Sequence, residues 1–372
     1  MQRLSRLITV KAPVHSVETA PGAPVAPEQL PGYQRQVSEK LKAELRNSTV
    51  ALLAATKRPD GSMPDRWGKQ CTAVMVKVPG YQSPLAVTAA HCFSQETGSE
   101  FGLLNIPTGH KALDFIKGDT SWYGLGDSSN EYLASQNLQP LAMIEGISIG
   151  RHKDMALLKI ADRVASSIPP NHGRSLAEIP AIEYRGMSQR PLPGERVTLA
   201  GVTAIPIPDA APPAPTNRNK LVQVNDGVYL GRIKLPEAGG DFNQLDLVAV
   251  PNTHGAEDDP CYWGASGSMA ITAGGQLLGP LSLISNPNYY QSSDRIFDRE
   301  LRLLIRDDLH LKVNNHAYPT ICGFSVMPKM TDLQADLAAF GDFAPSRTST
   351  PTNYRGVSHL YKVGEHGLIS ES

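Results

Sequence analysis

The chain has 372 residues, of which 32 are glycine and 30 are proline, while charged residues make up only 19%. This composition favours short strands joined by many turns, so we expect an all-β architecture. The formal net charge of −1 supplies no electrostatic footprint for a nucleic acid, and no apolar stretch reaches the roughly 20 residues that span a bilayer. We therefore expect neither a nucleic-acid partner nor membrane insertion.

Residues 1–47 are predicted to be a linker or pro-segment that ends in a short helix. Residues 11–32 are rich in Pro, Ala and Gly and show no periodicity, which is typical of an exposed linker. A helix is predicted from Tyr33 to Asn47, where apolar side chains recur every four residues among charged neighbours. These side chains are Val37, Leu41 and Leu45.

The main domain is predicted to span residues 48–325. Short apolar runs alternate there with turn residues, which is typical of antiparallel strands in sandwiches or barrels. Gly118–Gln139 and the proline-rich Pro206–Asn219 are predicted to be surface loops. The predicted strands are Thr49–Ala55, Thr72–Val78, Leu85–Ala90, Met155–Ile160, Arg196–Val202, Gly227–Leu235, Leu245–Val250, Gly267–Thr272 and Gln276–Ile284.

Helical spacing returns near the C-terminus. Arg295–Leu311 is predicted to form one helix, and Thr331–Phe340 a second one with Thr331 as its N-cap. The polar tail beyond Phe343 carries little core signal. Residues 326–372 are therefore predicted to be a partly disordered C-terminal extension.

The four cysteines bear on the cellular compartment. An even count is compatible with two disulfides and slightly favours a secreted or periplasmic protein. Residues 1–10, however, lack the apolar run of a signal peptide, so a cytoplasmic location stays open. No two cysteines are separated by two residues, so no structural zinc site is expected.

Two motifs contain candidate partners for a catalytic serine. A serine hydroxyl is a poor nucleophile until an imidazole can take its proton, and a carboxylate must hold that imidazole in the correct tautomer. His91 ends the apolar run LAVTAAHC, which would place it at a strand end on the rim of a barrel. Asp154 opens the run KDMALLKI, although an isolated aspartate there could also be a strand-edge charge.

The candidate nucleophile is Ser266 in CYWGASGSMAIT. Gly264 and Gly267 allow a sharp turn and a close approach of substrate backbone. The same short pattern occurs in ordinary turns between strands, and it also suggests the Gly-x-Ser-x-Gly elbow of α/β-hydrolases. Two observations exclude the elbow: Ser268 replaces its last glycine, and the chain order is His, Asp, Ser.

The three motifs, in this order, resemble those of the trypsin/chymotrypsin family of serine proteases. The segment Thr88–Cys92 is similar to the family's active-site histidine motif, and Asp154–Leu158 is similar to its aspartate motif. The resemblance implies two six-stranded antiparallel barrels with the active site in the cleft between them. It also implies a catalytic triad of His91, Asp154 and Ser266 and an oxyanion hole formed by the N–H groups of Gly264 and Ser266.

The same resemblance implies two disulfides and a substrate pocket. The disulfides would be Cys71–Cys92 and Cys261–Cys322. Asp259 would lie at the base of the pocket and favour Arg or Lys substrates, whereas counting back from Ser266 puts Pro260 there instead. Ser282 would lie near the triad aspartate, on a strand that pairs with substrate backbone, and Ile284 would narrow the pocket.

One position departs from the pattern of family members that mature by proteolysis. Those enzymes carry an aspartate directly before the nucleophile, where this chain has Ala265, and no Ile-Val-Gly-Gly-like sequence precedes the first strand. We therefore predict a site organised without the N-terminal activation switch, as in many bacterial and viral relatives.

The resulting functional prediction is a serine-type endopeptidase that acts on a protein or peptide substrate without a metal or organic cofactor. Two alternatives stay open. A catalytically inactive, protease-like binding protein would keep the barrels and lose the chemistry, and an esterase would use the same triad on a different substrate.

Overall fold

The computed structural model describes residues 35–56, 67–82, 85–93, 121–135, 138–149, 154–160, 174–185, 191–206, 217–236, 242–250, 260–262, 264–285, 320–338, 359–363 and 369–371. In chain order the elements are α1 (Glu39–Ser48), β1 (Thr49–Thr56), β2 (Gly68–Lys77), β3 (Leu85–Thr88), the one-turn helix η2 (Ala90–Phe93), β4 (Ser121–Gly126), α3 (Asn130–Leu133), β5 (Ala142–Ile149), β6 (Ala156–Ile160), η4 (Leu176–Glu178), β7 (Ile182–Glu183), β8 (Arg196–Pro206), β9 (Asn217–Pro236), β10 (Phe242–Val250), β11 (Met269–Thr272), β12 (Leu281–Ser285), β13 (Thr320–Ser325), α5 (Met330–Ala338), β14 (His359–Val363) and β15 (Ile369–Glu371).

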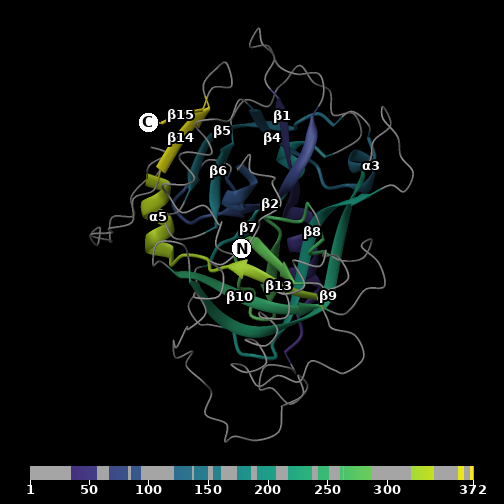
Figure 1. Cartoon of the computed structure of the whole chain (residues 1–372), viewed down its shortest axis with the longest axis vertical. Coiled ribbons are helices and arrows are strands. Elements are labelled where there is room, and N and C mark those ends of the chain that lie inside the picture. The colour runs from purple at the N-terminus through teal and green to yellow at the C-terminus, as the bar shows by residue number, and fades with distance from the viewer. Residues whose placement is uncertain are drawn as a thin grey trace, which may run out of the picture.

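The first unit is a closed barrel of six antiparallel strands, in the upper half of Figure 1. Its ring runs β1–β2–β3–β6–β5–β4 and closes where β4 pairs with β1. β2 is buried on both faces: Ala73 and Met75 belong to the barrel's own core, while Val74 and Val76 face a second cluster outside it. This double burial explains why the strand is a nearly continuous apolar run.

The second unit is a sheet of six antiparallel strands in the order β11–β8–β9–β10–β13–β12, in the lower half of Figure 1. Its end strands approach each other through two backbone hydrogen bonds. Gly267 N donates to Leu281 O at 3.1 Å, and Leu281 N donates to Ser268 O at 2.7 Å. The core of this unit includes the fully buried side chains of Tyr229 and Phe324.

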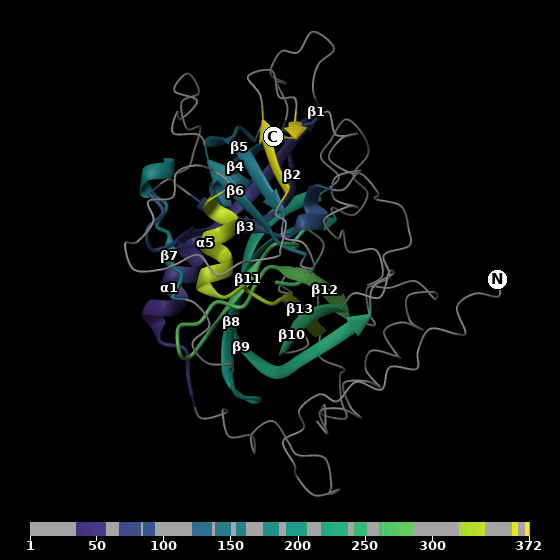
Figure 2. The same cartoon turned by 90° about the vertical axis from the view of Figure 1, so that its left-hand side faces the viewer.

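One apolar cluster joins the two units and both of the longer helices. Its buried members come from β2 and β3 of the first unit, from β8 and β11 of the second, from α1 and from α5. They include Val74, Val87, Ala200, Met269, Leu45, Leu333 and Leu337. Figure 2 shows α1 and α5 on the same side of the molecule, beside the junction of the two units. Burial of this cluster fixes the position of one unit against the other.

The predicted all-β class with two six-stranded antiparallel units is confirmed, and each predicted strand overlaps an observed one. The predicted loop Gly118–Gln139 is wrong, because β4 and α3 lie within it and β4 fills the gap between β1 and β5. β5, β7, β13, β14 and β15 were not predicted from the sequence either.

The helix predictions are confirmed with different ends. α1 begins at Glu39 because the Ser38 side chain accepts from Leu41 N and caps the helix. Thr331 lies in the first turn of α5 and is not its N-cap, since the helix already begins at Met330. The helix predicted over Arg295–Leu311 lies outside the described residues, and the predicted domain boundaries stay predictions.

Candidate active site

The structure brings His91 and Asp154 together. His91 lies in η2, directly after β3, and Asp154 lies two residues before β6. β3 and β6 are neighbours in the first barrel and pair Thr88 with Ala156, so the end of one strand lies beside the start of the other. The motif predictions for these two residues thus converge at one rim of the barrel.

Asp154 binds His91 through both of its carboxylate oxygens. Nδ1 of the His91 ring is 2.6 Å from Asp154 Oδ2, and the backbone N–H of His91 donates to Oδ1 at 2.8 Å. The Asp154 side chain is fully buried, whereas 19% of the His91 side chain is exposed. The carboxylate therefore holds the tautomer with its proton on Nδ1, which leaves Nε2 as the acceptor. Within the described residues Nε2 has no hydrogen-bond partner.

The same pair sets the electrostatics of the imidazole. Burial lowers the pKa of His91, but the charge of Asp154 and its hydrogen bond outweigh burial, so the pKa is raised above 6.5. A base with a raised pKa takes up a proton more readily, which suits a group that must accept one from a hydroxyl.

A disulfide ties the histidine turn to the neighbouring strand. Cys71 of β2 is bonded to Cys92, which directly follows His91, so the predicted Cys71–Cys92 bridge is confirmed. The Gln70 side chain donates to Cys92 O at 3.3 Å. Phe93, the last residue of η2, packs edge-on against Tyr123 with ring centroids 4.8 Å apart. The position of His91 is therefore fixed from β2, β4 and β6.

Ser266 lies in a turn that packs against the residues just before His91. Its carbonyl oxygen accepts a hydrogen bond of 2.8 Å from Thr72 N of β2. Gly267, the next residue, has φ +86°, and a Cβ there would overlap Thr72 O and Thr88 Oγ1 and lie 3.2 Å from Ala89 N. Only glycine fits this close approach. This close contact joins the two units. The turn of Ser266, which precedes β11 of the second unit, lies against β3 of the first unit, which leads to His91.

The Ser266 side chain is half-buried, and within the described residues its hydroxyl makes no hydrogen bond. Catalytic hydrogen bonds are often long in the absence of substrate and tighten only when it is bound. A hydrogen bond between Ser266 and His91 is therefore a matter of proposal and is not an observed contact.

The N–H groups predicted to form an oxyanion hole are available. Gly264 has φ +83° and precedes Ala265, whose N–H donates to Tyr262 O at 2.9 Å and closes the turn. A turn with a positive φ at its third residue favours glycine there. Among the described residues, no acceptor takes a hydrogen bond from Gly264 N or Ser266 N. Two unpaired donors flanking one residue can bind an anionic oxygen.

Ala265 is fully buried in the core of the second unit. This burial gives a physical reason for the departure from the family pattern, because an aspartate at this position would need a buried cationic partner. The prediction that no N-terminal switch operates stays a prediction.

The pocket residues are only partly described. Ser282 lies on β12, where its Oγ is 2.8 Å from Ser325 Oγ of β13 and donates to Pro280 O. Ile284 pairs through its backbone with Cys322, and the predicted Cys261–Cys322 disulfide is confirmed. Asp259 lies outside the described residues, so the prediction of basic-residue specificity stays a prediction.

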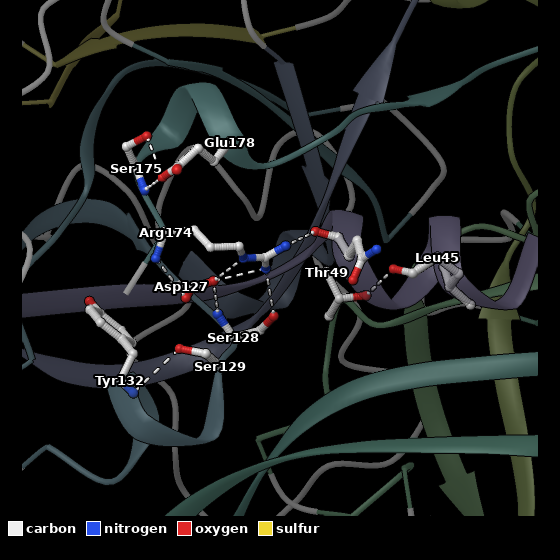
Figure 3. A network of polar contacts seen from close by, with 10 residues as sticks. Leu45, Thr49, Asp127, Ser128, Ser129, Tyr132, Arg174, Ser175 and Glu178 are labelled. Atoms are coloured by element: carbon white, nitrogen blue, oxygen red, sulfur yellow. Dashed lines mark hydrogen bonds and ion pairs between the residues drawn. The ribbon is translucent and has the colours of Figure 1, made fainter. Parts of the chain in front are cut away.

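Another buried carboxylate of the same barrel, Asp127, is engaged elsewhere. Arg174 binds it through Nε at 3.0 Å and Nη2 at 2.8 Å, and Arg174 N donates to its other oxygen at 3.1 Å (Figure 3). Nη1 of the same guanidinium donates to Asn47 O, near the end of α1. This network joins α1 to the segment between β4 and α3, so it is structural.

Lys69 is a site neighbour that sequence reasoning missed. It lies on β2, and its ammonium donates hydrogen bonds to the carbonyls of Val202 and Gly264. Nothing in the segment GKQC distinguishes this lysine from an exposed one.

The described residues hold neither a candidate metal site nor a candidate membrane span. No three His, Cys, Asp or Glu side chains gather there as they would around a metal ion. Nor is any helix in that part of the chain long and apolar enough to cross a membrane.

Comparison with known proteins found distant structural likenesses, among them the following two. A structure described as the atomic resolution structure of HBP is 11% identical, and the match covers 85% of this chain and 98% of that chain with a TM-score of 0.37. Human heparin binding protein is 13% identical over 67% of this chain and 83% of its own, with a TM-score of 0.33. No protein-family model and no curated protein matches the sequence. At these values the likenesses carry no argument about function, and the candidate site rests on this chain's own residues.

Proposed function

We propose that the protein is a serine endopeptidase with Ser266 as nucleophile, His91 as general base and acid, and Asp154 as the carboxylate that orients His91. The observation that carries the proposal is the pair of hydrogen bonds between His91 and Asp154. Gly267, next to Ser266, packs against Thr88 and Ala89, just before His91. An imidazole held in this way, with Nε2 unpaired among the described residues, is prepared to accept a proton from a serine hydroxyl.

The chemistry is acyl transfer in two stages. Ser266 Oγ attacks the scissile carbonyl carbon while its proton moves to His91 Nε2, and the N–H groups of Gly264 and Ser266 bind the resulting oxyanion. The C–N bond then breaks, and His91 gives its proton to the leaving amine. In the second stage His91 takes a proton from water, whose oxygen attacks the acyl carbon. The bond from the acyl carbon to Ser266 Oγ then breaks, His91 returns its proton to Oγ, and the acid is released.

An extended peptide suits the site better than a small ester. β12 is the last strand of its sheet, with β13 as its ladder partner among the described residues. A free strand edge can pair with an extended peptide backbone through main-chain hydrogen bonds. Ser282 and Ile284 lie on this strand, so substrate bound along it would run toward the turn that contains Ser266.

A binding protein without catalytic activity is the second candidate. The observation that favours it is the Ser266 hydroxyl, which makes no hydrogen bond to His91 within the described residues. In such a protein the strand edge of β12 would hold a peptide without cleaving it.

Hydrolysis measurements separate the two candidates. In an endopeptidase Ser266→Ala, His91→Ala and the double variant should each lower the turnover of a peptide substrate by about a millionfold, because triad members act as a unit. Ser268→Ala removes the other hydroxyl of the same turn, which donates to Ala265 O and supports the turn; it should lower turnover far less than a millionfold because that hydroxyl does not attack substrate. Peptide binding without measurable cleavage by the unmodified chain would support the binding protein. A panel of ester and peptide substrates tests for an esterase.

The two disulfides suit an oxidising compartment, so we propose a secreted or periplasmic location. Fractionation of cells that express the full chain, with alkylation of free thiols before lysis, tests this. Finding the protein in the cytoplasm with its four cysteines alkylated would contradict it.

A further inference from the structure

A lysine reaches from the first unit into the turn that holds the candidate nucleophile. Lys69 Nζ donates hydrogen bonds to two backbone carbonyls, Val202 O of β8 and Gly264 O of the nucleophile turn. Lys69 is partly buried, and no carboxylate pairs with it among the described residues. Its partners are the backbone groups themselves.

A β-bulge directs Lys69 toward this turn. In the pairing of β1 with β2, Leu52 is opposite Cys71 but Leu53 is opposite Lys69, so Gln70 is the extra residue. Side chains of residues that lie opposite each other share a face of the sheet. Lys69, opposite Leu53, therefore lies on the same face as Thr72, which is opposite Ala51. Without the bulge, an interval of three residues would put Lys69 and Thr72 on opposite faces.

Thr72 contacts the same two carbonyls. Its Oγ1 lies 3.2 Å from Val202 O and 3.3 Å from Gly264 O, and it accepts a hydrogen bond of 3.0 Å from Val202 N. Thr72 N also donates to Ser266 O. The side chains of Lys69 and Thr72 thus hold the nucleophile turn at the Gly264 carbonyl, and the backbone N–H of Thr72 holds it at the Ser266 carbonyl.

Holding the carbonyl of Gly264 fixes the peptide plane that joins it to Ala265, and together with a restricted φ this limits the direction of the Gly264 N–H group. The residue is already restricted by φ +83° and by the turn-closing bond from Ala265 N to Tyr262 O. A Cβ at Gly264 would overlap Lys69 Nζ in its present position, so the lysine end and the glycine lie in close contact. With its carbonyl fixed from β2, Gly264 has little freedom to rotate, and neither its N–H nor that of Ser266 has an acceptor among the described residues.

We propose that Lys69 is a positioning residue for the oxyanion hole, which holds the Gly264 carbonyl so that the N–H groups of Gly264 and Ser266 stay directed at the developing oxyanion. This inference rests on the proposed function, because an oxyanion forms only if Ser266 attacks a carbonyl. Lys69 itself does not touch substrate.

The role does not require a charged lysine. Burial lowers the pKa of Lys69 well below 10.5. A neutral amine still has two N–H groups, one for each of its two carbonyl partners, so the contacts persist in either protonation state. What matters is a donor at this position.

Lys69→Met tests the inference, because methionine keeps much of the length of the side chain and removes every donor. Lys77→Met is the matched control: Lys77 is on the same strand, but it is exposed. Active sites are first counted by titration with a fluorophosphonate, so that any loss of folded protein is corrected. Then kcat and KM for a peptide substrate, and the affinity of a peptide boronate that forms a tetrahedral adduct, are measured for each variant.

We expect Lys69→Met to lower kcat per competent site by about 100-fold, since displacement of a catalytic group by about 1 Å costs that much. KM should change by less than about threefold, and boronate affinity should fall in step with kcat/KM. Lys77→Met should match the unmodified chain in all three quantities. A purely structural lysine would instead reduce the number of competent sites and leave kcat per site unchanged.

If Lys69→Met does not fold, Lys69→Gln keeps an N–H donor on a shorter side chain and should show a smaller loss of kcat in the same direction. Unchanged kcat per site in the variant that folds would overturn the role of Lys69 and leave the proposed function standing. Absence of fluorophosphonate labelling and hydrolysis in the unmodified chain would remove the proposed function, and this inference with it.

Discussion

Asp154 binds His91 through two hydrogen bonds. Its Oδ2 is 2.6 Å from Nδ1 of the His91 ring, and its Oδ1 accepts from the His91 backbone N–H at 2.8 Å. The second contact matters as much as the first, because it anchors the turn that carries the ring as well as the ring itself. One buried carboxylate thereby determines the position, the tautomer and the basicity of the imidazole.

Replacing the carboxylate should abolish most of the activity without unfolding the protein. Asp154→Asn keeps the size of the side chain but can hold the ring in the wrong tautomer, so we expect kcat to fall by about 10⁴-fold. Hydrolysis of an activated ester is sensitive enough to measure the remainder. Circular dichroism should show the same β content as in the unmodified chain. A loss of less than tenfold would mean that Asp154 does not orient the catalytic base.

The dependence of kcat/KM on pH should report the raised pKa of His91. The base must be neutral to accept a proton, so kcat/KM should fall as the pH drops through the pKa of His91, with a midpoint above 6.5. In Asp154→Asn the charge that raises the pKa is gone and burial remains, so the midpoint should move to lower pH. Profiles recorded with saturating and limiting substrate check this. Identical midpoints in the two proteins would contradict the coupling.

The Asp127–Arg174 network should stabilise the fold and leave catalysis per site alone. Removing one partner leaves the buried Asp127 carboxylate without its cation, so Arg174→Met should lower the free energy of unfolding by about 3 kcal/mol. Urea denaturation measures this loss. Arg174→Met removes the partner of a different buried carboxylate in the same barrel, so it is also a control for Asp154→Asn. The kcat per competent site of Arg174→Met should stay within about twofold of the unmodified value.

The same network predicts the direction of an acid effect. Burial alone would raise the pKa of Asp127, but hydrogen bonds from Ser129 and Arg174 and the guanidinium charge outweigh it and lower the pKa below 3.8. The stabilisation is therefore present above pH 3.8 and is lost as the pH falls through the lowered pKa. In Arg174→Met the acid-unfolding midpoint should move to higher pH, as monitored by tryptophan fluorescence. A midpoint that stays in place would show that the ion pair does not set acid stability.

The two disulfides should contribute unequally to stability. The loop closed by Cys71–Cys92 spans 21 residues and that closed by Cys261–Cys322 spans 61. In the chain-entropy model these loops correspond to about 3 and about 4 kcal/mol. Thermal unfolding of the two double-alanine variants compares them. We expect the Cys71–Cys92 variant to lose more activity despite its smaller loss of stability, because that bridge adjoins His91.

The three motifs of the candidate site could be recognised in the sequence because each is local. His91, Asp154 and Ser266 each lie in a run of neighbours whose types indicate a strand end or a glycine-supported turn. Most strands could be predicted for the same reason, as apolar runs between turn residues. His91 lies near Asp154 because Thr88 of β3 pairs with Ala156 of β6. These segments are far apart in the chain, and their proximity was implied only by the family resemblance.

What could not be predicted depends on partners distant in the chain. β4 has the sequence SWYGLG, which has weak strand character on its own, and it is a strand because β1 and β5 pair with it on either side. Glu145 interrupts the apolar pattern of β5 at a register shift. The role of Lys69 could not be predicted because the extra residue Gln70 determines which face of the sheet the lysine lies on. Such a bulge is visible only in the register of two paired strands.

The central claim is that Ser266 is a nucleophile activated by His91, and covalent labelling tests it most directly. The full chain is treated with a fluorophosphonate at pH 8, digested, and analysed by mass spectrometry to find the modified residue. We expect one phosphonate per chain on Ser266, and no labelling of Ser266→Ala or His91→Ala under the same conditions. An unlabelled but folded protein, or an adduct that persists in Ser266→Ala, would contradict the account.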